Sequence, residues 1–226
     1  MLEFNGHRAR ASPVPHQPSP AKKERPAFAL PSAAPDQRHV FAYLRKRGIA
    51  PQVIQSFIQA GLLYEDADHH NAVFVGRDEQ GKVRHLHARG TLTGSHFRQT
   101  LPGSEKAYSF HWQGTSRKLY AFEAPIDMLS YISLHPEGWQ NHTYVAVCGV
   151  SAAPIHHFLE TQPQLGEVTL CLDNDEAGHN AARRIAAELL NKWNTAVSAE
   201  FPSQKDWNDE LLADRQEETQ GLTMSM

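Results

Sequence analysis

The chain has 226 residues, with 22 Lys plus Arg against 25 Asp plus Glu and a formal net charge of −3. A chain of this length can fold as one or two domains around a hydrophobic core, without a metal or a disulfide framework. The two cysteines, Cys148 and Cys171, form no Cys-x-x-Cys pair, which excludes a cysteine-based zinc module. No apolar run approaches the roughly 18 residues of a membrane span and no secretory signal begins the chain, so we expect a cytoplasmic protein with no membrane partner.

Charge is unevenly distributed along the chain. Residues 1–50 hold nine Lys and Arg against three acidic residues, a net charge of +6 that leaves −9 for the remainder. A basic first part suits a polyanion such as nucleic acid, and an acidic remainder suits divalent cations. Charge alone leaves open that these residues only form solvated faces.

The first 35 residues are predicted to be a disordered, Pro-rich, basic linker. Residues 9–35 hold seven of the 14 prolines and lack apolar periodicity. Because this linker stands at the start of the chain, we expect that a preceding module is encoded separately or has been lost.

Residues 36–116 are predicted to form a small α+β subdomain. Asp36 is the expected N-cap of a helix that Gly48 ends, and Pro51 lies in the first turn of a second helix. Two alternating segments follow and flank the turn 79–81, which predicts a β-hairpin.

Residues 117–212 are predicted to form an α/β domain. Short apolar strands at 118–124, 143–150, 167–173 and 196–202 alternate with helices. This order predicts a mainly parallel four-stranded sheet with helices on both faces, in which ligands bind at the carboxyl ends of the strands. Residues 213–226 are expected to be a flexible tail.

Carboxylates lie at the ends of two predicted strands. Glu123 ends the first strand, Asp173 and Asp175 follow the third, and Asp127 lies one turn into the helix after Glu123. We expect these side chains at one edge of the sheet, where several oxygen ligands favour Mg²⁺ or Mn²⁺. Such a site is suited to phosphoryl or nucleotidyl transfer, and Glu123, where it is not a ligand, can act as general acid or base.

These acidic residues are compatible with other roles. An EF-hand is disfavoured because Ala177 and Arg184 occupy two of its ligand positions. Asp173 and Asp175 as simple caps of the helix that begins near Glu176 remain an alternative. After the fourth strand, Lys205 and Asp206 add a cation for phosphate and further oxygens, although an ordinary helix start is also compatible with them.

The 14 histidines give a weaker metal signal. The pair His69–His70 and others like it lack helical spacing and a nearby carboxylate frame in the sequence, so we expect surface or core histidines. Phe97 and Tyr108 flank Arg98 and Lys106, an arrangement that could hold single-stranded nucleic acid by stacking.

Several motifs in order resemble a known family. FEAPID, with Glu123 and Asp127, and LDNDEAG, with Asp173 and Asp175, resemble the TOPRIM domain of topoisomerases, bacterial primases, small nucleases and recombination-repair proteins. VFVGRDEQGKVRHLHARGT, GSEKAYSF and KDWND are similar to segments of the bacterial primase core. The order also resembles a little-characterised domain that precedes TOPRIM in proteins of plasmids and mobile elements. The resemblance covers about residues 36–212.

The resemblance implies a Rossmann-like sheet and a role for each matching residue. Glu123, Asp173 and Asp175 would form the catalytic, metal-binding set, with Asp127 and Asp206 in support. The residues expected to bind nucleic acid are Arg89, Arg98, Lys106 and Lys205.

The expected function is Mg²⁺-dependent nucleotidyl transfer in the manner of a mobile-element primase core, on DNA or RNA that we expect to be single-stranded. Alternatives are a TOPRIM nuclease and a catalytically idle nucleic-acid-binding module. Primases carry an N-terminal cysteine-rich zinc module that nothing in this sequence can form, so a separate zinc-binding module and a helicase are candidate partners. The sequence does not distinguish DNA from RNA.

Overall fold

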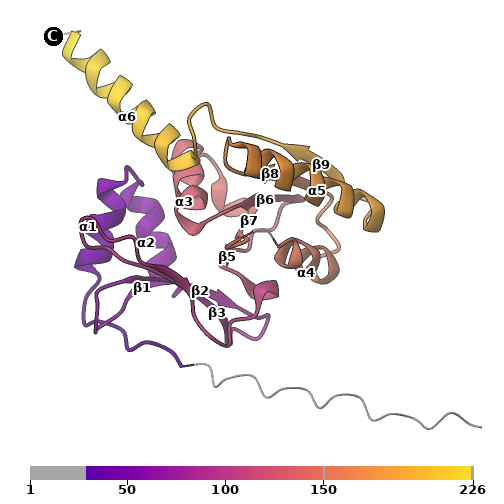
Figure 1. Cartoon of the computed structure of the whole chain (residues 1–226), viewed down its shortest axis with the longest axis horizontal. Helices are drawn as coiled ribbons and strands as arrows, with labels where there is room; N and C mark the ends of the chain where they lie inside the picture. Colours follow the sequence, from indigo (N-terminus) through magenta and orange to yellow (C-terminus); the bar gives the residue numbers. More distant parts are fainter. Residues whose placement is uncertain (1–28, 150, 225–226) are drawn as a thin grey trace, which may run out of the picture.

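The computed structural model describes residues 29–149 and 151–224 and contains two sheets (Figure 1). The first subdomain pairs two helices with an antiparallel sheet of strand order β1-β2-β3-β4. Its helices are α1 (Arg38–Lys46) and α2 (Pro51–Gln59), and its strands are β1 (Leu63–Glu65), β2 (Ala72–Arg77), β3 (Val83–Arg89) and β4 (Arg98–Thr100).

Local sequence accounts for these elements. Val40 and Leu44, four residues apart, are the buried residues of α1, and Gly48 follows the helix with a φ of +81° that favours glycine. Pro51 starts α2 at a position where the missing N–H is not needed. In the β2–β3 turn, the Asp78 Oδ1 atom accepts hydrogen bonds from backbone N–H groups and Gly81 has a φ of +78°.

The start of the ordered region differs from the prediction. Gln37, not Asp36, is the N-cap of α1, and it makes no side-chain cap hydrogen bond. The physical reason is that the carboxylate of Glu65 accepts the backbone N–H groups of His39 and Val40 at 2.9 and 3.1 Å. The predicted linker also ends earlier than residue 35, because the N–H of Ala34 donates to the carbonyl of Glu65. Residues 1–28 of that linker lie outside the described residues.

The second subdomain is a mainly parallel α/β sheet of strand order β5-β7-β6-β8-β9, which confirms the predicted fold class. A fifth strand, β5, joins the predicted four as an antiparallel edge, and its two residues are too few to give a periodic signal. The strands are β5 (His111–Trp112), β6 (Lys118–Phe122), β7 (Thr143–Ala146), β8 (Glu167–Cys171) and β9 (Ala196–Ala199). The helices are α3 (Pro125–Leu134), α4 (Ala153–Thr161), α5 (Glu176–Lys192) and α6 (Trp207–Met224), and η1 (Lys106–Tyr108) and η2 (Trp139–Asn141) are 3₁₀ turns.

Helices cover both faces of this sheet because successive strand residues point to opposite sides. Leu119 and Ala121 of β6 pack with residues of α4 and α5. Phe122 packs on the other face, with residues of α3 and with Trp207 of α6.

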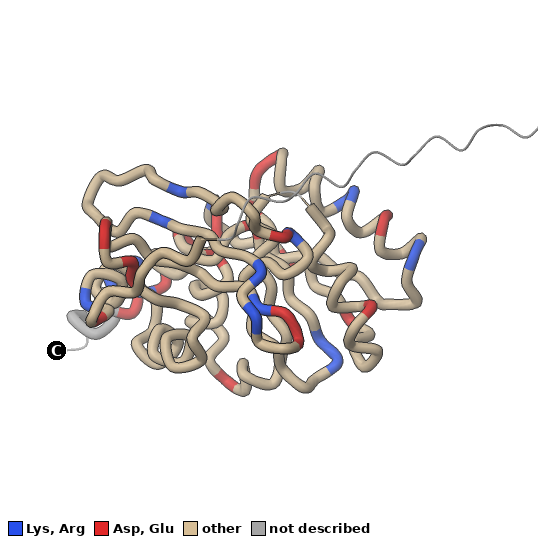
Figure 2. Tube along the Cα trace, turned by 90° about the horizontal axis from the view of Figure 1, so that it is seen from below, with Lys and Arg blue, Asp and Glu red and all other residues tan. Residues whose placement is uncertain are grey.

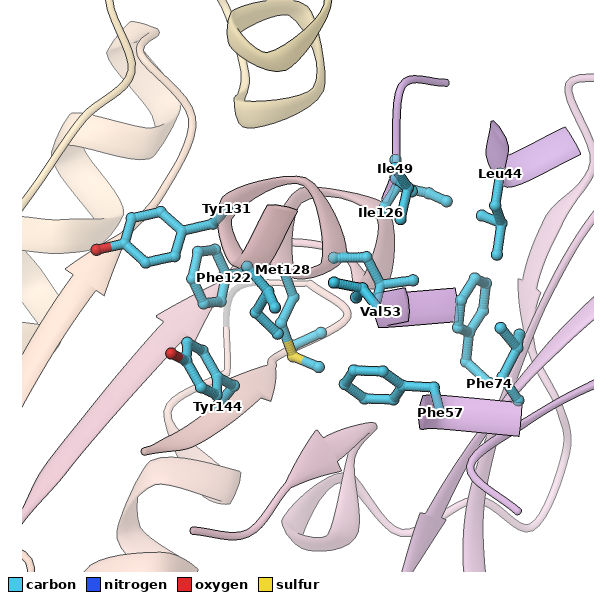
Figure 3. Packing of buried hydrophobic residues seen from close by; sticks show 14 of the residues in the cluster. Leu44, Ile49, Val53, Phe57, Phe74, Phe122, Ile126, Met128, Tyr131 and Tyr144 are labelled. Atoms are coloured by element: carbon cyan, nitrogen blue, oxygen red, sulfur yellow. The ribbon is translucent and has the colours of Figure 1, made fainter. Parts of the chain in front are cut away.

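One hydrophobic core joins the two subdomains (Figure 3). Val53 and Phe57 of α2 lie in the same buried cluster as Met128 of α3 and Tyr144 of β7. The Phe57 and Trp139 rings stack with centroids 5.7 Å apart. The position of the first subdomain against the sheet is therefore fixed by close packing.

Helix α6 extends beyond the predicted end of the domain. The expected flexible tail began at residue 213, but the structure continues the helix to Met224 (Figure 1). The segment has Ala, Arg, Gln and Glu residues, which form helices well, and its polarity concealed the helix from a search for apolar periodicity. Within the described part of the chain, no helix is both long and apolar enough to cross a bilayer.

Candidate functional site

A cleft of about 510 Å³ lies where the carboxyl ends of β6 and β8 face strands β3 and β4. Its lining includes both acidic and basic side chains. The acidic ones are Glu123, Asp127, Asp173 and Asp206, and the basic ones are Arg47, Arg89, Arg98 and Lys205.

Strand register brings the acidic residues together. Phe122 is paired with Cys171 in the parallel β6–β8 ladder, so the residues that follow each strand emerge at the same edge. The N–H of Asp173 donates to Oε1 of Glu123 at 3.4 Å. Ala124, the N-cap of α3, separates Glu123 from Pro125, which starts that helix.

Asp173 is partly buried, and its surroundings disfavour its charged form. Burial raises the pKa of its carboxyl to about 7, and the nearby charges of Glu123, Asp206 and Asp175 add to the effect, while Lys205 opposes it. Its Oδ1 atom is buried and has no hydrogen-bond partner among the described residues. A buried carboxylate oxygen without a partner, surrounded by other carboxylates, fits a divalent cation ligand.

Asp127 is the most buried of these acids, with 7% of its surface exposed. Burial raises the pKa of Asp127 well above its usual value, and the charges of Asp173, Asp206 and Glu123 raise it further, against Arg89. The pKa of Glu123 is also raised, chiefly by burial. In the absence of a cation, these surroundings therefore disfavour the charged forms of the carboxyl groups of Asp127, Glu123 and Asp173.

Asp175 and Asp206 have capping roles. The Oδ1 atom of Asp175 accepts the N–H of Gly178 at 2.8 Å, which is the N-cap bond of α5, and Asp175 does not line the cleft. Asp206 lines the cleft, and its Oδ1 atom accepts the N–H of Asp209 at 2.8 Å at the start of α6. Asp175 thus matches the capping alternative, and its charge still raises the pKa of Asp173.

Three of the four predicted nucleic-acid-binding residues line the cleft. Arg89 is held by its Nε–H, which donates to the Tyr43 hydroxyl at 2.8 Å, and Arg98 is its partner across the β3–β4 ladder. The carbonyl of Lys205 accepts the N–H of Asn174 at 2.9 Å, so this loop lies beside the acidic turn. Lys106 lies in η1 and does not line the cleft.

The predicted aromatic pair beside these cations is also divided. Phe97, next to Arg98, is 44% exposed. Tyr108 instead contacts the ring of His157, with centroids 4.5 Å apart, and lies beneath the guanidinium of Arg84. Of this pair, Phe97 remains available for stacking beside the basic wall of the cleft, which Arg47, Arg89 and Arg98 form.

Sequence reasoning missed Arg47 and Asn208 of the lining. A guanidinium N–H of Arg47 donates to Oδ1 of Asn208 at 2.8 Å, while Nδ2 of Asn208 donates to the Arg47 carbonyl at 2.8 Å and to the Ser130 hydroxyl at 3.0 Å. The only signals were the basic run 45–47 and the KDWND motif. His87 also lines the cleft, and burial together with Arg89 lowers the pKa of His87 to about 4, so its ring is neutral near pH 7.

Charge over the described chain is less segregated than the sequence suggested. Five of the nine basic residues of the first 50 lie within residues 1–28, outside the described part. Basic and acidic positions are interspersed along the trace (Figure 2). The basic wall of the cleft is therefore a local feature of β3, β4 and Arg47, the residue that follows α1.

The fold is that of a primase catalytic core. The primase fragment of the Bacteriophage T7 primase-helicase protein superposes with a TM-score of 0.61 at 21% identity, covering 91% of this chain and 82% of that chain. The DnaG catalytic core gives a TM-score of 0.56 at 21% identity, covering 85% and 74%. The DnaG primase catalytic domain bound to ssDNA gives 0.57 at 20% identity, covering 80% and 71%. At these identities the likeness shows the fold alone.

Two family models match consecutive segments. Residues 42–116 match the family described as "Protein of unknown function (DUF3991)", and residues 120–211 match the family described as "Toprim-like". The two matches, a DUF3991 region followed by a Toprim-like domain, have the order that the sequence motifs predict, and they confirm the resemblance seen in the sequence.

A curated relative matches most of this chain and is itself longer. An uncharacterized protein of Bacillus anthracis, pXO2-78/BXB0107/GBAA_pXO2_0107, is 27% identical over 198 residues. The match covers 77% of this chain and 57% of the relative, so the chain spans little more than half the length of that protein.

Proposed function

We propose that the protein is a Mg²⁺-dependent nucleotidyl transferase that acts on single-stranded nucleic acid in the manner of a primase core. The observation that supports this most is the cleft in which Glu123, Asp127 and Asp173 face basic side chains of the other subdomain. A group of partly buried carboxylates suits a cation, and guanidinium groups opposite them suit phosphates.

The acidic edge would hold the metal. Asp173 and Glu123 are the proposed ligands, with Asp127 and Asp206 in support, and Asp175 acts through its charge and its cap of α5. When bound, Mg²⁺ or Mn²⁺ neutralises charge on a phosphodiester and lowers the pKa of an attacking hydroxyl. Where Glu123 is left outside the ligand set, its raised pKa suits it to take up and return a proton.

The basic wall would hold the strand. Arg47, Arg89 and Arg98 can pair with successive phosphates, and Lys205 reaches the same cleft from the acidic side. Phe97 offers an exposed ring next to Arg98, on which a base can stack. Because these contacts read the backbone and the π-face, they predict little sequence preference.

Partners and setting are part of the same proposal. A helicase and a separately encoded zinc-binding module are the proposed partners, and a mobile element is the proposed genetic setting. The primase domains in one structural relative are described as bound to an RNA/DNA hybrid and dTTP. That description is of the relative, and it supports testing both DNA and RNA here.

The test uses the full chain with a labelled single strand, nucleoside triphosphates and Mg²⁺ or Mn²⁺. We expect metal-dependent extension, which Asp173→Asn and Glu123→Gln reduce by at least about 100-fold, since each removes charge from the proposed metal site. Asp214→Asn, an exposed change on α6, is the control for loss of one charge and keeps full activity.

The same assay separates the other candidate functions. Shortening of the labelled strand would identify a nuclease, and metal-dependent retention without turnover would identify a binding module. Full activity in both Asp173→Asn and Glu123→Gln would refute the proposed site.

A further inference from the structure

Two histidines and a glutamate converge outside the lining of the acidic cleft. Nδ1 of His39 lies 2.8 Å from Oε1 of Glu65, and Nδ1 of His70 lies 2.6 Å from the same oxygen. The two imidazole rings are 4.2 Å apart between centroids. One ligand atom from each of the three residues lies within 4.8 Å of the others. His39 lies in the first turn of α1, Glu65 ends β1, and His70 lies in the β1–β2 turn.

The Glu65 carboxylate is fixed before any ligand binds. Its side chain is 1% exposed, and Oε2 accepts the N–H groups of His39 and Val40 at the start of α1. Only Oε1 is presented to the two imidazoles. Hydrogen bonds of this kind to the second oxygen of a carboxylate are how proteins orient a metal ligand.

The turn that carries His70 is also held in place. The Asp66 carboxylate accepts the N–H groups of three turn residues, Asp68, His69 and Asn71. The Thr91 hydroxyl donates to the His70 carbonyl at 2.7 Å, and His70 has a φ of 56°, in the left-handed region that few non-glycine residues adopt. The backbone therefore holds the ring of His70 beside that of His39.

The donor set selects the class of cation. Two imidazole nitrogens and one carboxylate oxygen suit Zn²⁺, whereas Mg²⁺ prefers oxygen ligands. Tetrahedral Zn²⁺, with bonds of about 2.0–2.1 Å, separates its ligand atoms by roughly 3.3 Å, which is slightly wider than the two present N···O contacts with Glu65. The His39 and His70 side chains are 53% and 44% exposed, so both rings have room to open by that amount.

We propose that His39, Glu65 and His70 form a Zn²⁺ site with a fourth position open to water. The bound ion joins the start of α1 to the β1–β2 turn and so stabilises the first subdomain. The sequence concealed the site, because Glu65 and His39 are 26 residues apart and the pair His69–His70 supplies only one of the ligands. This proposal is independent of the proposed function, since none of the three residues lines the acidic cleft.

The test measures Zn²⁺ on the full chain by equilibrium dialysis, in millimolar Mg²⁺ so that Mg²⁺ competes with Zn²⁺ for the acidic cleft. We expect one Zn²⁺ per chain, and at least about tenfold weaker binding in His39→Asn and in His70→Asn. Asparagine is chosen for His70 because it tolerates a positive φ. His69→Asn is the matched control, because the His69 side chain is 77% exposed and lies outside the cluster. This variant should bind Zn²⁺ as the wild type does.

Co²⁺ in place of Zn²⁺ supplies a second readout. Wild type and His69→Asn should give the visible absorption of a four-coordinate Co²⁺ site, and His39→Asn and His70→Asn should lose it. Thermal melts without metal should show that these variants remain folded. The proposal is overturned if the wild type retains no Zn²⁺ or if both histidine variants bind it normally. It is also overturned if only Asp173→Asn lowers Zn²⁺ binding, because the ion then lies in the cleft.

Discussion

At the residue scale, Asp173 is a cleft residue whose surroundings strongly disfavour the charged form of its carboxyl group. Its buried Oδ1 atom has no hydrogen-bond partner within the described residues, and its carboxyl is surrounded by acids on three segments of chain. The sequence placed Glu123 and Asp173 at one edge because strand ends can be read from apolar runs. The sequence could not show that an oxygen of Asp175 accepts the capping hydrogen bond of α5, because capping and metal binding favour the same residue type.

The pKa of Asp173 predicts how Mg²⁺ affects stability. A carboxyl whose pKa rises from 3.8 to about 7 on folding contributes its full stability below pH 3.8, and this contribution is lost as the pH rises through about 7. A bound cation offsets the repulsion that develops at high pH. We therefore expect Mg²⁺ to raise the melting temperature more at pH 8 than at pH 5.

Thermal melts at both pH values, with and without Mg²⁺, check this expectation. The rise in melting temperature caused by Mg²⁺ should differ less between pH 5 and pH 8 in Asp173→Asn than in the wild type. In Asp214→Asn this difference should persist. Equal Mg²⁺ effects at pH 5 and pH 8 in the wild type would contradict it.

At the scale of elements, the β8–α5 turn depends on Gly178. A Cβ atom at this position would lie 2.1 Å from the carbonyl oxygen of Asp173, far inside contact distance. The close approach lets the N–H of Gly178 reach Oδ1 of Asp175 while the chain doubles back past Asp173. The glycine thus allows one turn to cap α5 and to present Asp173 to the cleft.

Gly178→Ala should therefore destabilise the protein, although alanine is the better helix former. Helix propensity alone would favour alanine by about 1 kcal/mol, but the clash with backbone must displace the turn. We expect a net loss of about 1–3 kcal/mol in the free energy of unfolding, measured by urea denaturation, together with weaker Mg²⁺ binding. Asn180→Ala, an exposed change two residues further along α5, is the control. A stabilised Gly178→Ala variant would show that the turn can relax freely.

Element prediction from sequence succeeded where periodicity or turn chemistry was strong. Helices α2 and α5 and the β2–β3 hairpin follow from Pro51, from apolar spacing and from the Gly81 turn. Strands β1, β4 and β5 have two or three residues, so pairing with neighbours defines them and no local pattern does. β4 matters for the site because it carries Arg98. The sequence could therefore name Arg98 but not the strand that places it in the basic wall.

At the scale of the whole molecule, the two segments that match the family models share one hydrophobic core. Phe57 and Ile54 of the DUF3991 region are fully buried in the cluster that contains Ile126 and Met128 of the Toprim-like domain. Each such side chain contributes about 1.5–3 kcal/mol through burial. The loss of several of them would be comparable with the margin of about 5–15 kcal/mol by which a typical protein is stable.

We therefore expect that residues 117–226, produced alone, do not unfold cooperatively. Calorimetry should show a weak or absent transition, and size-exclusion chromatography should show association through the exposed face of α3. A chain of residues 29–226 should melt as the full chain does, because it keeps every described contact of the core. A sharp transition of the shorter fragment near the melting temperature of the full chain would contradict this expectation.

The common core also limits how such genes can evolve. A recombination breakpoint between residues 116 and 120 falls between the two segments that match family models. It would nevertheless pack α2 against an α3 from a different protein, whose apolar surface did not evolve with it. Exchange of one half between relatives requires matching changes at the apolar surface of the other. Inheritance of both halves as a single unit follows from the packing itself, whatever reaction the cleft performs.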